Sequence, residues 1–172
     1  MKIFLTGATG FVGSHFLKKL LADGHEVISH IRSSNGIKTI EKLAGSYWLG
    51  SLNDIEALKA PLFSCDAVIH CAAYLKFWGP EKDFEDANIG ITKNLLYATK
   101  QSNVGRFIFI SAASVAMNER KVLINVDESQ PYCSLIEMSY SRTKAVAEQL
   151  VLSAHSSQLK TIALRPPFIW GN

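Results

Sequence analysis

Residues 2–13, KIFLTGATGFVG, decide the fold that this sequence predicts. A short apolar run typical of a strand passes into a turn with a glycine at every third position, and residues of helical period follow. Glycines at such a turn let backbone N–H groups approach a phosphate closely, and the helix N-terminus favours an anion. The candidate phosphate-binding residues in this turn are Gly7, Thr9, Gly10 and Gly13. A glycine-rich turn without a ligand is the alternative, and the position between the first strand and the first helix favours the ligand.

The rest of the chain continues the alternation of strand and helix. We expect strands at 2–6, 26–31, 46–50, 66–71, 106–111 and 161–165, and helices at 11–23, 38–44, 53–60, 84–103 and 138–157. The strands are continuous hydrophobic runs, which predicts burial on both faces. The order predicts an α/β fold, a doubly wound parallel sheet with helices on both faces. A length of 172 residues suits one domain, residues 1–172.

Composition and charge argue against several classes of protein. The chain has 18 Lys and Arg against 15 Asp and Glu, a net charge of +3, and its basic residues form no stripe, so we expect no nucleic acid partner. The N-terminal apolar run is too short for a signal peptide or a membrane span, which predicts no membrane partner and a cytoplasmic protein. Three cysteines without a CxxC pair and five histidines without a Cys/His cluster predict reduced thiols and no metal. A small-molecule partner remains.

Two connections are longer than turns. Residues 73–83 and 112–137 both follow predicted strands, on the side where open α/β sheets bind ligands. Tyr74, Phe77 and Trp78 make the first connection a candidate ligand wall. A hydrophobic contact of these side chains with the sheet is the competing interpretation.

The end of the second predicted strand bears on the choice of cofactor. An acidic residue there would accept a hydrogen bond from the ribose 2′-hydroxyl of NAD, whereas an arginine can hold the 2′-phosphate of NADP. Here Arg32 follows the strand with no carboxylate beside it, and Ser33 and Ser34 add two hydroxyls. This predicts NADP, with NAD as the alternative cofactor, and a solvated arginine is the competing interpretation.

Tyr140 and Lys144 form a candidate catalytic pair. They lie four residues apart in a segment of helical period, so their side chains share one face. A neighbouring ammonium favours the phenolate and should lower the tyrosine's pKa. The pair can then exchange a proton with a substrate oxygen while a nicotinamide moves hydride.

Five motifs, in order along the whole chain, resemble the extended short-chain dehydrogenase/reductases, the NAD-dependent epimerase/dehydratase superfamily. They are TGATGFVG at 6–13, VIHCAA at 68–73, NIGITKNLL at 88–96, YSRTK at 140–144 and LRPPFIWG at 164–171. The strand that ends at Arg32 looks like the NADPH-dependent dihydroflavonol reductases. Residues 76–94 and the run Ser114-Val115-Ala116 look like the 3β-hydroxysteroid dehydrogenases. The resemblance implies a Rossmann-type fold.

The resemblance also implies roles for individual residues. Gly50-Ser51-Leu52 is similar to the family's Gly-Asp-Leu, so Ser51 and Leu52 would lie near the adenine. Cys71, Ala72 and Ala73 would line the adenosine and ribose side. The amides of Phe11 and Val12 would hold the pyrophosphate together with the three glycines. Asn88 would lie near the nicotinamide ribose, and Pro166 and Phe168 near the nicotinamide itself. Tyr140 and Lys144 would also bind the cofactor.

The sequence departs from the family at one catalytic position. Ala112 occupies the place of a serine or threonine that would hydrogen-bond the substrate oxygen, and Ser111 or Ser114 would have to replace it. Losing such a donor costs roughly 3 kcal/mol of transition-state stabilisation. Full-length relatives continue beyond the RPPFIWG segment, so we expect the C-terminal substrate-binding part to be absent from this chain.

The expected activity is that of an NAD(P)H-dependent oxidoreductase acting on a carbonyl or secondary alcohol. Two alternatives stay open: a nucleotide-sugar epimerase or dehydratase, and a dinucleotide-binding module without catalysis, which Ala112 favours. Family members often dimerise through the helices that correspond to 84–103 and 138–157, so a homodimer is expected by analogy.

Overall fold

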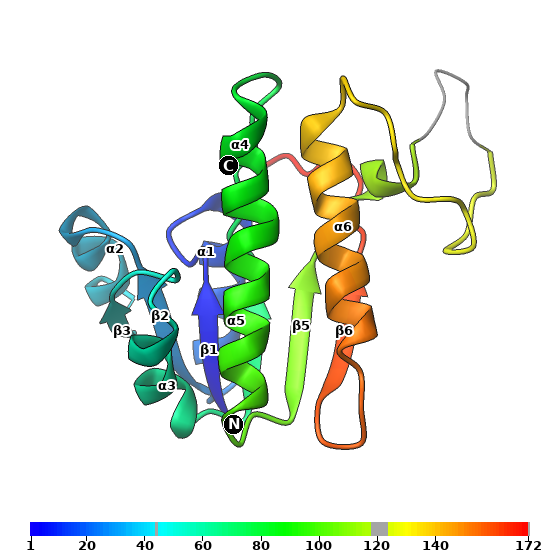
Figure 1. Ribbon diagram of the computed structural model, residues 1–172. Coiled ribbons are helices and arrows are strands. Elements are labelled where there is room, and N and C mark those ends of the chain that lie inside the picture. The colour runs from blue at the N-terminus through cyan, green and yellow to red at the C-terminus, as the bar shows by residue number, and fades with distance from the viewer. Residues whose placement is uncertain (44, 118–123, 172) are drawn as a thin grey trace.

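The computed structural model describes residues 1–43, 45–117 and 124–171, and six parallel strands form its centre (Figure 1). Their order across the sheet is β3-β2-β1-β4-β5-β6. The strands are β1 (Lys2–Thr6), β2 (Glu26–Ile31), β3 (Ser46–Leu49), β4 (Ala67–His70), β5 (Arg106–Ile110) and β6 (Lys160–Leu164). The winding reverses between β1 and β4, and ligands bind beyond the carboxyl ends of the strands at such a point. The predicted α/β, Rossmann-type doubly wound sheet is confirmed.

Helices cover the sheet on both faces. Leu17 of α1 (Phe11–Ala22) and Ile40 of α2 (Ile37–Glu41) pack on one face in a core cluster with Leu5. The other face carries α3 (Ile55–Phe63), α5 (Ile91–Lys100) and α6 (Ser139–Ser153), with α5 and α6 in contact in front of the central and later strands (Figure 1). Phe4 and Phe107 belong to the core cluster on this second face.

Burial differs between the central and the edge strands. Every residue of β4 is buried, and so are the last four of β1, as predicted. At the edges the prediction is wrong, because β3 and β6 each have a neighbouring strand on one side only. Ile162 and Leu164 of β6 are exposed, whereas Ala163 packs against the core cluster beside α6.

The helix expected over 84–103 is three consecutive elements. A short α4 (Glu81–Phe84) passes into a π-helix, η2 (Glu85–Gly90), and then into α5. Short π-helical segments are rare and are frequently found at functional sites. The described residues also include the 3-10 turns η1 (Ser34–Gly36) and η3 (Ala113–Ala116).

Parts of two sequence predictions lie outside the described residues. They are position 44 of the expected helix 38–44 and positions 118–123 of the expected connection 112–137. None of the helices in the described part of the chain combines the length and the apolar character that a bilayer crossing requires.

Candidate active site

A cleft of about 820 Å³ opens beyond the carboxyl ends of β1, β2 and β4. This volume is within the range of roughly 300–1,000 Å³ that is typical of small-molecule sites. The cleft brings together nine of the residues that the sequence predicts for a cofactor: Gly7, Thr9, Gly10, Arg32, Ser51, Leu52, Cys71, Ala72 and Ala73. They come from four separate connections, which the parallel sheet gathers at one edge.

The glycine turn between β1 and α1 fits a pyrophosphate. Gly7 has a φ of 72°, and a Cβ there would lie 2.8 Å from Ala72 N, so a side chain is excluded for both reasons. A Cβ at Gly13 would lie 2.1 Å from Gly7 O, which keeps the helix close against the turn. The N-cap residue Gly10 provides no side-chain cap, and the first turn has no acidic residue. No side chain therefore competes with an anion for the amides at the start of α1. The predicted residues Phe11, Val12 and Gly13 do not themselves line the cleft.

The second strand leads to a polar corner of the same cleft. Arg32 is exposed, and no acidic side chain in the described ranges forms an ion pair with it. Ser33, Asn35 and Thr39 line the cleft beside it. Asn35 and Thr39 were not predicted from the sequence. Asn35 follows the predicted strand by four residues, which was a usable signal, whereas Thr39 lies in the predicted helix 38–44.

His30 lies on the β2 wall of the cleft, and its Nε2 is 3.0 Å from Gly50 O. Burial lowers the pKa of His30, and the nearby Arg32 contributes in the same direction. A neutral His30 that donates from Nε2 to this carbonyl holds the connection after β3, which carries Ser51, against β2.

Tyr140 and Lys144 both belong to α6, as the spacing predicts. Lys144 is buried between α6 and β5, where its Nζ donates a 2.6 Å hydrogen bond to Ile110 O. The same Nζ lies 3.8 Å from the centre of the Phe109 ring. Burial lowers the pKa of Lys144 to about 7, and the charges of Cys71 and Glu148 oppose that shift.

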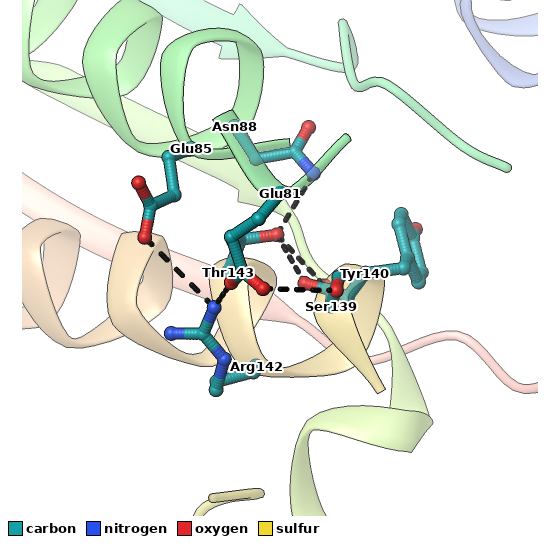
Figure 2. Close-up of polar contacts among 7 residues, drawn as sticks. All are labelled: Glu81, Glu85, Asn88, Ser139, Tyr140, Arg142 and Thr143. Carbon is teal, nitrogen blue, oxygen red and sulfur yellow. Dashed lines mark hydrogen bonds and ion pairs between the residues drawn. The ribbon is translucent and has the colours of Figure 1, made fainter. Parts of the chain in front are cut away.

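The Tyr140 side chain leaves the first turn of α6 on the side away from Glu81 and Arg142 (Figure 2). Burial raises the pKa of the Tyr140 hydroxyl, and the Lys144 charge has no part in that shift. The expectation that the lysine lowers the tyrosine's pKa is therefore wrong for this conformation, in which Nζ is directed to Ile110 O.

The end of β5 carries the two candidate serines. Ser111 is buried, and its Oγ has no hydrogen-bond partner among the described residues. Ser114, in η3, is only partly buried. Ala112 stands between them in an extended conformation. Of the two residues, Ser114 is the more exposed, and neither lines the cleft.

The segment after β6 runs past this region. Pro166 O accepts a 2.8 Å hydrogen bond from Ala113 N, and an added Cβ at Gly171 would lie 3.1 Å from the Phe11 ring. Phe168 is 89% exposed. The segment lies beside η3 and the glycine turn, but neither Pro166 nor Phe168 lines the cleft.

Asn88, in η2, is buried and does not line the cleft. Its Oδ1 accepts a 2.7 Å hydrogen bond from Tyr74 N, and its Nδ2 donates to Thr143 Oγ1 over 3.1 Å. In this conformation its side-chain amide thus hydrogen-bonds Tyr74 and Thr143. The expected contact with the nicotinamide ribose stays a prediction.

A buried ion pair was missed in the sequence. Glu148 of α6 is 1% exposed, and Arg165 donates to its Oε1 from Nε and Nη2. Tyr132 donates to the same oxygen over 3.0 Å. Only Glu148 offered a signal, since it lies four residues after Lys144 on the same helix face.

The aromatic connection 73–83 does not pack on the sheet as a unit. Phe77 and Trp78 are 93% and 81% exposed, so the hydrophobic-contact interpretation is wrong for both. Tyr74 lines the cleft and makes an edge-to-face contact with Phe84, at 4.9 Å between ring centres.

Comparison with known proteins places this geometry in a family. A profile of the 3-beta hydroxysteroid dehydrogenase/isomerase family matches residues 4–172, and the chain belongs to that family, within the extended short-chain dehydrogenase/reductases. A 4-hydroxy-2-methyl-3-oxo-4-farnesyl-3,4-dihydroquinoline-1-oxide ketoreductase of Stigmatella aurantiaca is 34% identical over 171 residues, which are 99% of this chain and 51% of the relative. The chain spans about half the length of the curated relatives it matches.

Two solved structures share the fold closely. A short-chain dehydrogenase/reductase superfamily protein from Agrobacterium tumefaciens with bound NAD has a TM-score of 0.80 and 30% identity, covering 96% of this chain and 48% of its own. A UDP-glucose-4-epimerase from Stenotrophomonas maltophila, with bound NAD and formylated UDP-arabinopyranose, has a TM-score of 0.82 and 27% identity, covering 96% and 52%.

Proposed function

We propose that this chain binds a nicotinamide dinucleotide in the cleft, and that the protein it belongs to is an oxidoreductase acting on a carbonyl or secondary alcohol. One observation supports this proposal most strongly. A single cleft is lined by the uncapped start of α1, by the turn at Gly7 and by the corner at Arg32. The turn would hold the pyrophosphate, and the connection after β3 the adenine. The ketoreductase similarity and the NAD-bound relative support the same class of reaction.

The corner at Arg32 favours NADP(H) over NAD(H). The guanidinium is exposed at the end of β2, and hydroxyl and amide side chains line the cleft around it: Ser33, Asn35 and Thr39. A guanidinium with neighbouring hydroxyls suits a 2′-phosphate, which needs charge and several donors. NAD(H) is the alternative, because both solved relatives described above hold NAD.

The catalytic roles fall to α6 and the end of β5. When bound, the dinucleotide supplies hydride transfer at its nicotinamide. Tyr140 would give a proton to, or take one from, the substrate oxygen, and Lys144 would hold the ribose. Ser114 would hydrogen-bond the substrate oxygen in place of the serine that Ala112 replaces, because it is more accessible than Ser111.

Two rival functions make different predictions. The similarity to a UDP-glucose-4-epimerase favours a nucleotide-sugar epimerase, which would retain NAD on purification. A module that only binds dinucleotide would keep the cleft without turnover, and Ala112 favours it. Assaying purified protein for retained NAD, and then for turnover of ketones and UDP-sugars, separates the three.

The cofactor proposal is tested by calorimetry with NADPH and NADH. Wild type should prefer NADPH, and Arg32→Ala should lose that preference while its NADH affinity changes little. Lys38→Ala is the matched control, since Lys38 is an exposed cation in the neighbouring α2 that does not line the cleft. Equal affinities in wild type, or an equal loss in both variants, would contradict the NADP(H) preference.

We also propose, by analogy with family members, that the protein forms a homodimer through α5 and α6. Tyr97 of α5 and Leu152 of α6 are large apolar side chains that are 53% and 41% exposed. Tyr97→Glu should shift the protein to the monomer in light scattering after gel filtration. Tyr47→Glu, on the edge strand β3, is the control and should leave the mass unchanged.

A further inference from the structure

His70 lies at the carboxyl end of β4 and is fully buried. Both ring nitrogens make contacts: Nδ1 is 2.7 Å from Thr6 Oγ1, and Nε2 is 3.0 Å from Thr92 Oγ1. Burial, with a smaller contribution from Lys144, lowers the pKa of His70 to about 3. The imidazole is therefore neutral near pH 7 and has one donor and one acceptor.

The neighbouring hydroxyls fix the direction of these bonds. The Thr92 hydroxyl donates to Asn88 O over 2.7 Å, so it accepts from Nε2–H of His70. Nδ1 must then accept from the Thr6 hydroxyl, which itself accepts from Ala72 N over 3.2 Å. The result is a directed chain of hydrogen bonds that starts at the wall of the cleft, where Ala72 lies, and ends in η2.

Asn88 extends the connection from η2 to α6. Its Nδ2 donates to Thr143 Oγ1, and that hydroxyl donates to Ser139 O over 2.7 Å, with Tyr140 O at 3.1 Å (Figure 2). The first turn of α6 has no side-chain cap. Helix ends without caps fray, so this contact holds the turn that carries Tyr140.

Ion pairs join the same two elements at the surface. The guanidinium of Arg142, in α6, pairs with Glu81 and lies 3.8 Å from Glu85 (Figure 2). Ser139 of α6 is also within 3.5 Å of Glu81. The segment from Glu81 through η2 and the start of α6 are thus connected both in the interior and at the surface.

We propose that His70 is a positioning residue that couples the phosphate-binding turn to the first turn of α6. The proposal rests on the proposed function, because it links dinucleotide binding after β1 to the placement of Tyr140. Thr6 immediately precedes Gly7, so an adjustment of the turn around a pyrophosphate acts directly on the Thr6 bond to His70. Buried hydrogen bonds in series are directional and reinforce one another, and they pass such an adjustment through Thr92 to Asn88 and α6.

The first test needs no cofactor. The NMR signal of ¹³Cζ-labelled Tyr140, assigned with Tyr140→Phe, is compared in wild type, Thr6→Val and Thr92→Val. Each variant removes one hydroxyl from the series of hydrogen bonds and keeps a side chain of the same shape, so both should shift the Tyr140 signal. Thr99→Val is the matched control: among the described residues its buried hydroxyl bonds only to Leu95 O of its own helix, and the Tyr140 signal should not move. A Tyr140 signal that is unchanged in Thr6→Val overturns the proposal.

Histidine ¹⁵N spectra give a second readout. His70 should be the Nε2–H tautomer and should not titrate between pH 5 and 8. Observation of the Nδ1–H tautomer would reverse the direction of the chain and overturn the proposal. His70→Asn, which lacks the nitrogen that contacts Thr92, should abolish the effect of Thr6→Val on Tyr140.

A double-mutant cycle then measures coupling in the dinucleotide site. NADPH dissociation constants are compared for His70→Asn, Thr143→Val and the double variant. These two residues share no direct contact, so independent structural effects would multiply. Coupling predicts that the double variant loses affinity by less than the product of the two single losses, by about twofold or more. Simple multiplication overturns the proposal. If wild type binds neither NADPH nor NADH, the proposed function fails, and the NMR comparisons still decide the positioning role.

Discussion

The Arg165 guanidinium donates two hydrogen bonds, of 2.9 and 2.7 Å, to one carboxylate oxygen of Glu148. Arg165 follows β6 and Glu148 lies in α6, so the pair joins the last strand to the helix that carries Tyr140 and Lys144. Glu148 is 1% exposed, and its other oxygen has no partner among the described residues. The carboxylate therefore depends on Arg165 to remain charged in the interior.

Arg165→Met should destabilise the fold strongly, because it leaves a buried carboxylate uncompensated. Breaking such a pair costs about 3–5 kcal/mol. Urea unfolding measures the loss, and the double variant Glu148→Leu/Arg165→Met should recover most of it. Lys19→Met is the control: it breaks an exposed i,i+4 pair with Asp23 and should cost no more than about 0.5 kcal/mol. A loss in Arg165→Met as small as the control's would show that the pair does not stabilise the domain.

Tyr140→Phe should abolish turnover and leave the fold intact. Removing a proton donor costs on the order of 10²–10⁴-fold in rate. No described side chain hydrogen-bonds the Tyr140 hydroxyl, so the free energy of unfolding should change by less than about 0.5 kcal/mol. Turnover is measured on the protein that contains this chain, with a panel of ketones and alcohols. Tyr97→Phe, at an exposed position of α5, should keep full activity. Full activity in Tyr140→Phe would favour the non-catalytic module.

His70 gives the stability a particular dependence on pH. Its pKa is lowered from 6.5 to about 3 in the fold, so between these values the unfolded chain binds a proton that the native state does not. Stability contributed by the neutral ring is complete above about pH 6.5 and is lost as the pH falls toward 3. His70→Asn removes this contribution. The difference in unfolding free energy between wild type and His70→Asn should therefore shrink across that range, and parallel curves would contradict the assignment.

The fold followed from the sequence because its signals are local. The glycine spacing at residues 7–13 and the alternation of strands with helices depend on neighbouring residues, and the sheet order agrees with them. The contacts that organise α6 are between residues far apart in the chain. Asn88 and Thr143 are 55 residues apart, and no periodicity links them. The sequence predicted an ordinary α-helix where the π-helix holds Asn88, because the two kinds of helix have nearly the same composition.

The predicted cofactor residues also divide into those fixed by local signals and those that depend on tertiary contacts. Nine of those in the connections after β1, β2, β3 and β4 lie at the cleft, since each is fixed by its place near the end of a strand. Lys144 was predicted to act on Tyr140 from spacing alone. Its actual partner, Ile110 O, is supplied by a strand 34 residues earlier, and this tertiary contact sets where the ammonium lies.

Dinucleotide binding should take up protons through Lys144. Burial holds the pKa of Lys144 at about 7, below its ordinary 10.5, so above pH 7 the free protein carries mostly the neutral amine. A bound polyanion favours the ammonium and raises that pKa in the complex. Binding then draws a proton from solution, and affinity should fall as the pH rises above about 7. Calorimetric titrations with NADPH at pH 8, in two buffers of different ionisation enthalpy, measure the uptake directly. Lys144→Met should bind with no uptake, because its side chain cannot titrate. Equal heats in the two buffers for wild type, or uptake that persists in Lys144→Met, would show that Lys144 is not the group that takes up the proton.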